Sequence, residues 1–178
     1  MKMRIVYLFW ISLALVFAGG VLSLAQVAAS ARNATAEEIT GKWQLLPLPD
    51  SVEPKILKNN PWPAACQWYS YSSSGALKSI DKTNSPCEAM SSAEFDKVLP
   101  HVASVVSWKY DLSPVYQKAL IIVSRTDVPH YAEYWEPQIV TKAFSRDGVD
   151  FREGDLILYL HNLNTHKMVW IRHLRRLK

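Results

Sequence analysis

The stretch that decides the fold is DLILYLHNLNTHKMVWIRHLRRL, residues 155–177. Two apolar runs are separated by a polar segment rich in Asn and His, which is typical of a β-hairpin. Side chains alternate between the two faces of a strand. If the two strands pair in an odd register, the face toward the core carries Leu156, Leu158, Leu160, Val169 and Ile171. The opposite face then carries Ile157, Tyr159, His161, Met168, Trp170 and Arg172.

This second face is aromatic, amphipathic and partly charged, and such a face is rarely left fully in water. Three explanations stay open: it lines a cavity in a barrel, it meets a partner, or it packs under the proline-rich segment 48–65. A ligand-binding face would be built from Trp108, Tyr159, Trp170 and Arg172.

The rest of the chain is mostly short strands bounded by turn residues. Ser74-Gly75 and Asp147-Gly148 are tight-turn dipeptides, and the second is a strong hairpin signal. Pro137 must bend its strand or lie at an edge. The remaining strands are expected within residues 40–46, 66–81, 102–110, 119–125 and 131–144.

One helix is expected at residues 91–100, where Ser91 and Glu94 form a capping box. The pattern therefore predicts an all-β fold with about eight antiparallel strands and one short helix. A closed barrel removes exposed strand edges, so we expect a barrel, with a two-sheet sandwich as the alternative.

Residues 1–31 have the order of a secretory signal peptide. Lys2 and Arg4 precede an apolar run, and Ala29 and Ala31 are spaced as at a cleavage site. The alternative is an uncleaved anchor that associates with the membrane through residues 5–31, a stretch without charge. Either way we expect residues 32–178 to be one exported domain, periplasmic or extracellular.

Cys66 and Cys87 are the two cysteines of the chain. In an oxidising compartment such a pair usually forms a disulfide, which would add on the order of 3 kcal/mol. A redox pair or a metal site is disfavoured, because the spacing is not Cys-x-x-Cys.

The charge balance excludes a typical nucleic-acid-binding protein. Of the 20 Lys and Arg residues, Lys2 and Arg4 lie in residues 1–31. The other 18 are nearly balanced by 16 Asp and Glu residues. Basic residues concentrate in IRHLRRLK, residues 171–178, which is either a solvated strand end or a site for an anionic lipid or polymer.

The sequence contains no recognisable catalytic motif, such as a nucleophile elbow or a phosphate loop. Glu133 and Glu136 are three residues apart, so on a strand they would point to opposite faces. His161 and His166 could face one another in the last hairpin, but two histidines at one turn are a weak metal site. We therefore expect a protein that binds rather than catalyses, without a cofactor or a metal.

The segment AEEITGKWQLL, residues 36–46, resembles the start of the lipocalin-like (calycin) barrels. The resemblance implies that Trp43, two residues after Gly41, plugs the closed end and packs on a basic side chain from a late strand. Arg172, Arg175 or Arg176 could supply that side chain. It also implies an apolar interior that holds a small hydrophobic ligand or lipid.

The order of Gly41, Trp43, Cys66, Cys87, Leu99-Pro100 and Trp108 is also similar to small periplasmic barrels that inhibit bacterial metalloproteases. That resemblance implies a protease-binding trunk at residues 32–37, although the region after residue 125 has no counterpart. The leading expectation is thus an exported binding protein for a small apolar ligand or lipid. The alternative is a protein-binding module, such as a protease inhibitor or an accessory subunit of an envelope complex.

Overall fold

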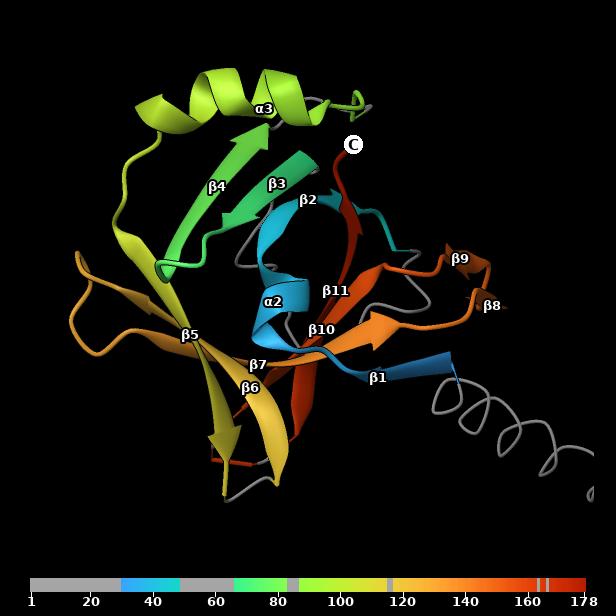
Figure 1. Ribbon diagram of the computed structural model, residues 1–178. Coiled ribbons are helices and arrows are strands. Elements are labelled where there is room, and N and C mark those ends of the chain that lie inside the picture. Colours follow the sequence, from blue (N-terminus) through green and yellow to red (C-terminus); the bar gives the residue numbers. More distant parts are fainter. Residues whose placement is uncertain (1–29, 49–65, 83–86, 115–116, 163, 166) are drawn as a thin grey trace, which may run out of the picture.

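The computed structural model describes residues 30–48, 66–82, 87–114, 117–162, 164–165 and 167–178 (Figure 1). Within them the chain is almost entirely β-structure. The strands are β1 (Ala31–Asn33), β2 (Gly41–Leu46), β3 (Cys66–Tyr71), β4 (Ala76–Lys82), β5 (Val106–Ser113), β6 (Lys118–Arg125), β7 (Ala132–Val140), β8 (Phe144–Arg146), β9 (Val149–Phe151), β10 (Leu156–His161) and β11 (Met168–Arg176). The helices are α2 (Ala36–Ile39), α3 (Ser92–Val98) and the 3-10 turn η1 (Leu99–His101).

Eight strands close into an antiparallel barrel: β2 to β7, β10 and β11. The order in the sheet is β1-β7-β10-β11-β2-β3-β4-β5-β6, and β6 also pairs with β7 to complete the circle. The prediction of an all-β barrel is confirmed over the sandwich. An eight-stranded barrel of this kind is consistent with a lipocalin-like fold.

Pro137 marks the point at which one edge of β7 changes partner. Residues 132–135 of β7 pair with β6, and residues 138–140 pair with β1. Proline has no N–H to donate to a sheet, and its carbonyl accepts instead from the Ala34 backbone N–H at 3.0 Å. Pro137 therefore lies where β7 exchanges β6 for β1 as its neighbour.

In the last hairpin, the side chains are divided between the two faces differently from the prediction. His161 pairs with Met168 in the expected odd register, but a bulge follows, and Leu160 pairs with Trp170 and Leu158 with Arg172. A one-residue shift moves every later side chain to the other face. Trp170 and Arg172 therefore face the interior with Leu158, whereas Ile171 and Tyr159 face outward. The expectation that Tyr159 shares a face with Trp170 and Arg172 is wrong.

Two elements cover parts of the outer surface of the barrel. α3 lies across β3 and β4, where Phe95 packs with Trp68 and Cys66 (Figure 1). The capping box of Ser91 and Glu94 at its start is present as predicted.

The second covering element is the β8–β9 hairpin, which lies apart from α3 in Figure 1. Its turn contains Asp147-Gly148, as predicted, and Phe144 pairs with Phe151. Their rings stack with centroids 4.7 Å apart. Together with Ile157 they make a second core on the outer face of β10.

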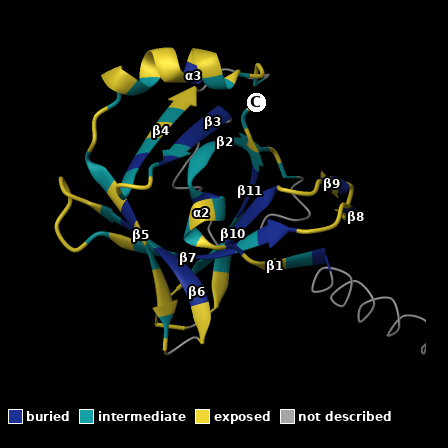
Figure 2. Ribbon diagram, viewed as in Figure 1, coloured by how far each residue is buried: buried dark blue, intermediate teal, exposed yellow. Residues whose placement is uncertain are grey.

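The main core lies inside the barrel. Buried residues follow the barrel strands, while α3 and the connections are largely exposed (Figure 2). The core combines four tryptophans and two tyrosines with aliphatic side chains: Ala34, Ile39, Trp43, Tyr69, Tyr71, Leu77, Trp108, Ile121, Val123, Trp135, Ile139, Leu156, Leu158, Trp170 and Leu174.

The predicted disulfide between Cys66 and Cys87 is present, which suggests an oxidising, exported compartment. The predicted leader or anchor lies mainly in residues 1–29, outside the described residues. Among the residues described, no helix has the length and apolar character needed to cross a membrane.

The segment that the inhibitor resemblance assigns to a trunk is packed against the barrel. Arg32 and Asn33 pair with β7, Ala34 is fully buried, and Thr35 caps α2 through a capping box with Glu38. The Arg32 guanidinium also lies 2.6 Å from the Glu38 carboxylate. Residues 32–37 thus do not protrude as a protease-binding trunk would require.

Candidate functional site

The Gly-x-Trp motif closes one end of the barrel. Trp43 is fully buried, and its Nε1 donates to the Ile39 carbonyl at 2.8 Å. Of the three arginines considered, Arg176 lies over its ring, with Cζ 4.3 Å from the ring centroid. The Arg176 guanidinium also donates to the carbonyls of Glu38 and Thr40. These contacts tie α2, β2 and β11 together.

Gly41 allows this closure because of both its backbone and its size. Its φ of +142° is one that L side chains rarely adopt, and a Cβ there would overlap the Arg176 guanidinium. Gly41 and Trp43 therefore lie together with Arg176 at one end of the barrel, where the motif predicts a plug.

Arg172 lies in the interior of the barrel, one step along the inward-facing row of β11 from Trp170 and Leu174. Arg172 is buried, with only 5% of its surface exposed. Its Cζ lies 4.2 Å from the ring centroid of Trp135 and 5.1 Å from that of Tyr69. A cation between two aromatic rings gains from the negative faces of both.

Further polar groups surround this arginine. Glu133 accepts from Trp135 Nε1 at 2.8 Å and from the Tyr131 hydroxyl. On the neighbouring side of the interior, the Tyr69 hydroxyl donates to Gln67. Burial raises the pKa of Tyr69, while the charge of Arg172 acts in the opposite direction. The interior is thus apolar toward Trp43 and carries a charged, hydrogen-bonded layer around Arg172.

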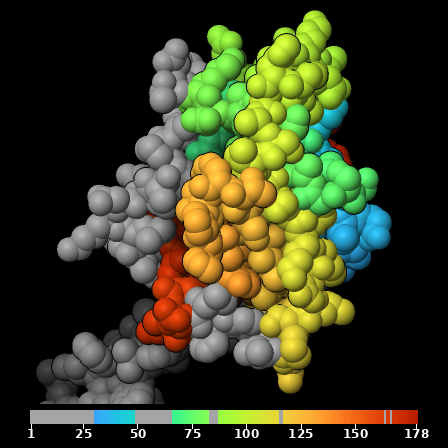
Figure 3. Space-filling view, turned by 90° about the vertical axis from the view of Figure 1, so that its left-hand side faces the viewer, coloured from blue at the N-terminus to red at the C-terminus, as the bar shows by residue number. Residues whose placement is uncertain are grey.

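Tyr131 connects this layer to the surface, because it follows the β6–β7 connection. Residues 125–130 are all exposed, and they form a prominent part of the face seen in Figure 3 (orange). Arg125 reaches back over the Tyr131 ring, with Cζ 5.9 Å from its centroid. This connection therefore borders the polar layer of the interior.

The structure brings together three of the four predicted ligand-binding residues. Trp108 and Trp170 belong to the interior core with Trp135, and Arg172 lies beside Trp135. Tyr159 is separated from them by the wall of the barrel and packs on the outer cluster around Phe144. Tyr159 alternates with the inward-facing Leu158, and the bulge separates it from Trp170 and Arg172 by moving those two residues to the face of Leu158.

Glu133 and Glu136 point to opposite faces, as expected. On the outer face, Glu136 accepts from Lys118 at 2.9 Å and from the His161 Nε2 at 3.1 Å. Burial alone would raise its pKa, but these contacts lower it to about 2. The carboxylate is therefore held as an ion and is a poor general base. His166 lies outside the described residues, and the described part of the chain contains no group of three or more potential metal ligands.

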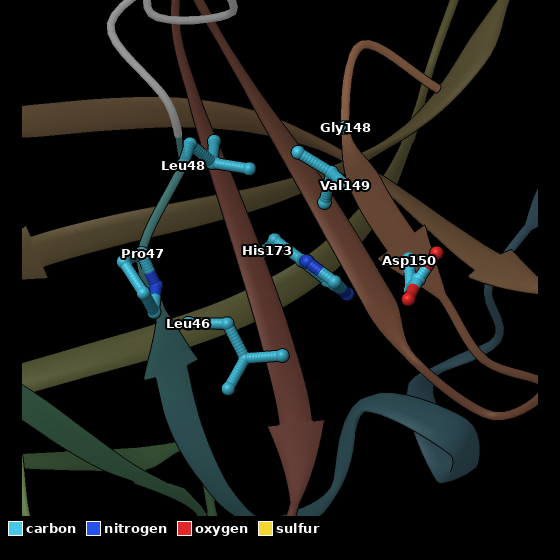
Figure 4. Close-up of a pocket in the computed structure, with 7 residues that line it drawn as sticks. All are labelled: Leu46, Pro47, Leu48, Gly148, Val149, Asp150 and His173. Carbon is cyan, nitrogen blue, oxygen red and sulfur yellow. The ribbon is translucent and has the colours of Figure 1, made fainter. Parts of the chain in front are cut away.

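A groove opens on the outer face of the barrel beside the β8–β9 hairpin. It has a volume of about 410 Å³. The close-up in Figure 4 shows the His173 ring between Leu46 and Leu48 on one side and Val149 and Asp150 on the other. The lining residues are Leu46, Pro47, Leu48, Gly148, Val149, Asp150 and His173.

Beneath the groove lies a buried charge network centred on Asp155. His173 Nε2 lies 2.7 Å from Asp155 Oδ2, and Arg175 donates to both carboxylate oxygens at 2.9 and 2.7 Å. The Arg152 backbone N–H adds a further bond. Burial would raise the pKa of Asp155, but its partners lower it to about 2.

The sequence pattern did not predict this network. Asp155 and His173 are 18 positions apart, and each looks like an ordinary polar residue at the end of an apolar run. Only the register of β10 with β11, which places them at matching ends of the hairpin, reveals that they meet.

Comparison of the chain with protein-family models, with curated proteins and with solved structures gave no match.

Proposed function

We propose that the chain is an exported, non-catalytic binding protein of lipocalin-like type. Its interior holds a small amphipathic ligand, such as a fatty acid, whose apolar body lies among the tryptophans. The acidic head group pairs with Arg172. The observation that carries the proposal is the burial of this guanidinium between Trp135 and Tyr69, inside the barrel.

A buried charge is costly. Replacing a buried ionic group with apolar side chains of similar volume is often neutral or stabilising, so stability alone gives little reason for an arginine at this position. A ligand site does, since binding pockets combine apolar and aromatic walls with a few polar groups that orient the ligand.

Export is supported by two independent features. The disulfide between Cys66 and Cys87 is typical of oxidising compartments, and the order of charged, apolar and small residues in positions 1–31 is typical of a signal peptide. We assign the protein to the periplasm or the extracellular space on these grounds. The near balance of charges favours a small molecule over nucleic acid.

Titration with two ligands of equal chain length tests the proposal. Laurate and dodecanol differ in the head group, so only laurate can pair with Arg172. We expect laurate to change the tryptophan fluorescence and to bind more tightly than dodecanol. Arg172→Met should weaken laurate binding about tenfold or more, the value of a charge-assisted contact, and should change dodecanol binding little.

Arg146→Met is the matched control, because Arg146 is an exposed residue of the β8–β9 hairpin, outside the barrel. It should bind laurate as the wild type does. Circular dichroism checks that both variants are folded. The proposal fails if laurate does not bind to the wild-type protein, or if folded Arg172→Met binds laurate with unchanged affinity.

A further inference from the structure

The strand β1 lies where the sequence predicts the cut that removes the leader. Ala29 and Ala31 have the spacing of a cleavage site, so the sequence alone places the cut after Ala31. In the structure, however, β1 runs beside β7 (Figure 1), and its first residue, Ala31, lies opposite Val140. A cut after Ala31 would therefore remove part of a strand of the folded domain.

Ser30 continues the pairing of β1 with β7 by one residue. Its backbone carbonyl accepts from the backbone N–H groups of Thr141 at 2.9 Å and of Lys142 at 3.3 Å. Beyond the other end of β1, the Ala34 N–H donates to the Pro137 carbonyl at 3.0 Å. Backbone hydrogen bonds thus attach the chain to β7 from Ser30 to Ala34.

The end of β7 depends on this neighbour. β6 pairs only with residues 132–135 of β7, and among the described residues β1 is the strand that replaces it beside residues 138–140. Without Ser30, the N–H groups of Thr141 and Lys142 would lose the acceptor that they share, and each hydrogen bond lost lowers the stability of the fold. The shortened edge would also be open to pairing with other chains. The pairing of β1 with β7 is therefore complete only if Ser30 and Ala31 stay attached.

A second bond in the same stretch suits a signal peptidase. The enzyme needs a small residue immediately before the bond that it cuts, and a small or short aliphatic residue two positions further back. For the bond between Ala29 and Ser30, these positions hold Ala29 and Val27. A cut at this bond leaves the whole of β1 with the domain.

We propose that a signal peptidase cuts the chain between Ala29 and Ser30, so that Ser30 is the first residue of the mature protein. The enzyme hydrolyses this amide bond with one water molecule, which leaves a carboxyl group on Ala29 and an amino group on Ser30. The proposal rests on the proposed export of the protein. Its structural reason is that this cut releases the leader and keeps the hydrogen bonds of Ser30 to β7, whereas a cut after Ala31 removes them.

The first residue of the exported protein tests the proposal directly. The full chain is expressed in a bacterial host, and the protein is isolated separately from the periplasmic, membrane and cytoplasmic fractions. Mass spectrometry of the intact protein and of its N-terminal peptide then identifies where the chain begins. We expect the periplasmic protein to begin at Ser30.

Isoleucine substitutions at the two candidate bonds make a matched pair. Ala31→Ile removes the small residue that a cut after Ala31 requires, and isoleucine suits a β-strand, so this variant should still be cut before Ser30. Ala29→Ile removes the small residue before the proposed bond, so the amount of protein that begins at Ser30 should fall at least tenfold. Pulse labelling follows the cut in newly made chains, so the result does not depend on how stable each variant is.

An exported protein that begins at Arg32, or at any residue other than Ser30, overturns the proposal and leaves export intact. A membrane-bound protein that keeps Met1 has the same meaning, because its leader is then an anchor. The proposal also fails if Ala31→Ile is not cut, or if Ala29→Ile is cut before Ser30 as the wild type is. A full-length protein found only in the cytoplasm would overturn both this proposal and the proposed export.

Discussion

Arg176 and Trp43, 133 positions apart in the chain, lie face to face, with the guanidinium carbon 4.3 Å from the centroid of the indole ring. The guanidinium continues beyond the ring to the carbonyls that end α2. One side chain therefore covers the plug and satisfies backbone acceptors at the same end of the barrel. This contact should carry a large share of the stability of the closed end.

Replacing Trp43 with alanine tests the plug. The substitution removes a fully buried ring and leaves a cavity, so we expect a loss of about 3–5 kcal/mol in the free energy of unfolding. Urea denaturation followed by circular dichroism measures it. A change close to zero would contradict the structural role of the Gly-x-Trp motif.

Substitutions at two glycines test the close approach of Arg176 to Gly41. Gly41 and Gly148 both have positive φ, but a Cβ at Gly148 meets nothing within 4 Å, whereas one at Gly41 overlaps Arg176. Gly148→Ala should cost about 1 kcal/mol, from the backbone alone. Gly41→Ala should cost roughly 2 kcal/mol more, because a φ of +142° suits alanine less than one of +79° and because Arg176 must leave Trp43. Equal losses in urea denaturation would show that the close approach of Arg176 is not required.

The buried Asp155 predicts a loss of stability in acid. Its pKa is about 2 in the folded protein against an ordinary value of 3.8. A lowered carboxyl pKa stabilises the fold fully above the ordinary value, and the stabilisation disappears as the pH falls toward 2. The difference in unfolding free energy between wild type and Asp155→Asn should therefore shrink by roughly 2 kcal/mol from pH 6 to pH 2.

Asp127→Asn serves as the control for this experiment. Asp127 also pairs with an arginine, Arg125, which lowers its pKa, but the pair is exposed to solvent. Its variant should follow the wild type closely at every pH, because exposed ion pairs contribute little. If Asp155→Asn parallels the wild type as well, the buried network does not contribute to acid sensitivity.

Removal of the disulfide should lower stability without changing the fold. Cys66 and Cys87 are 21 positions apart, and a cross-link of this span is worth roughly 3 kcal/mol through the restricted unfolded chain. The double variant Cys66→Ser, Cys87→Ser should unfold at correspondingly lower urea concentration. The wild-type protein in reducing buffer should shift by a similar amount, and the double variant in the same buffer should not shift further.

Features that depend on a few neighbouring residues were predicted from the sequence. Ser91 and Glu94 cap α3, Asp147-Gly148 turns a hairpin, and the motif of Gly41 and Trp43 indicates the plug. Each depends on residues within a few positions of one another, so local chemistry is sufficient to identify it.

The faces of the last hairpin were not predictable in this way. The bulge between Leu160 and His161 adds one residue to the register, and no sequence signal announces it. The consequence reaches the whole of β11, since it places Arg172 inside the barrel and leaves Tyr159 outside. The strict alternation of side chains along β11 would place Arg172 on the outer face. Its position in the core depends on the pairing of β10 with β11, which the sequence pattern does not show.

The groove and its network were missed for a related reason. His173 and Asp155 look like solvated residues at the ends of strands, and only their burial together makes them notable. The sequence shows neither the packing of Phe151 on His173 nor the position of the β8–β9 hairpin over β11.

The position of β11 between β10 and β2 also has a consequence for the order of folding. Residues 168–176 follow all the other barrel strands in the sequence, yet they close the barrel by joining β10 to β2. Until this strand has been synthesised, the remaining barrel strands can form only an open sheet with two unpaired edges, β10 and β2. Such edges are prone to pair with other chains, so the interval before β11 arrives is when the nascent protein most needs a chaperone.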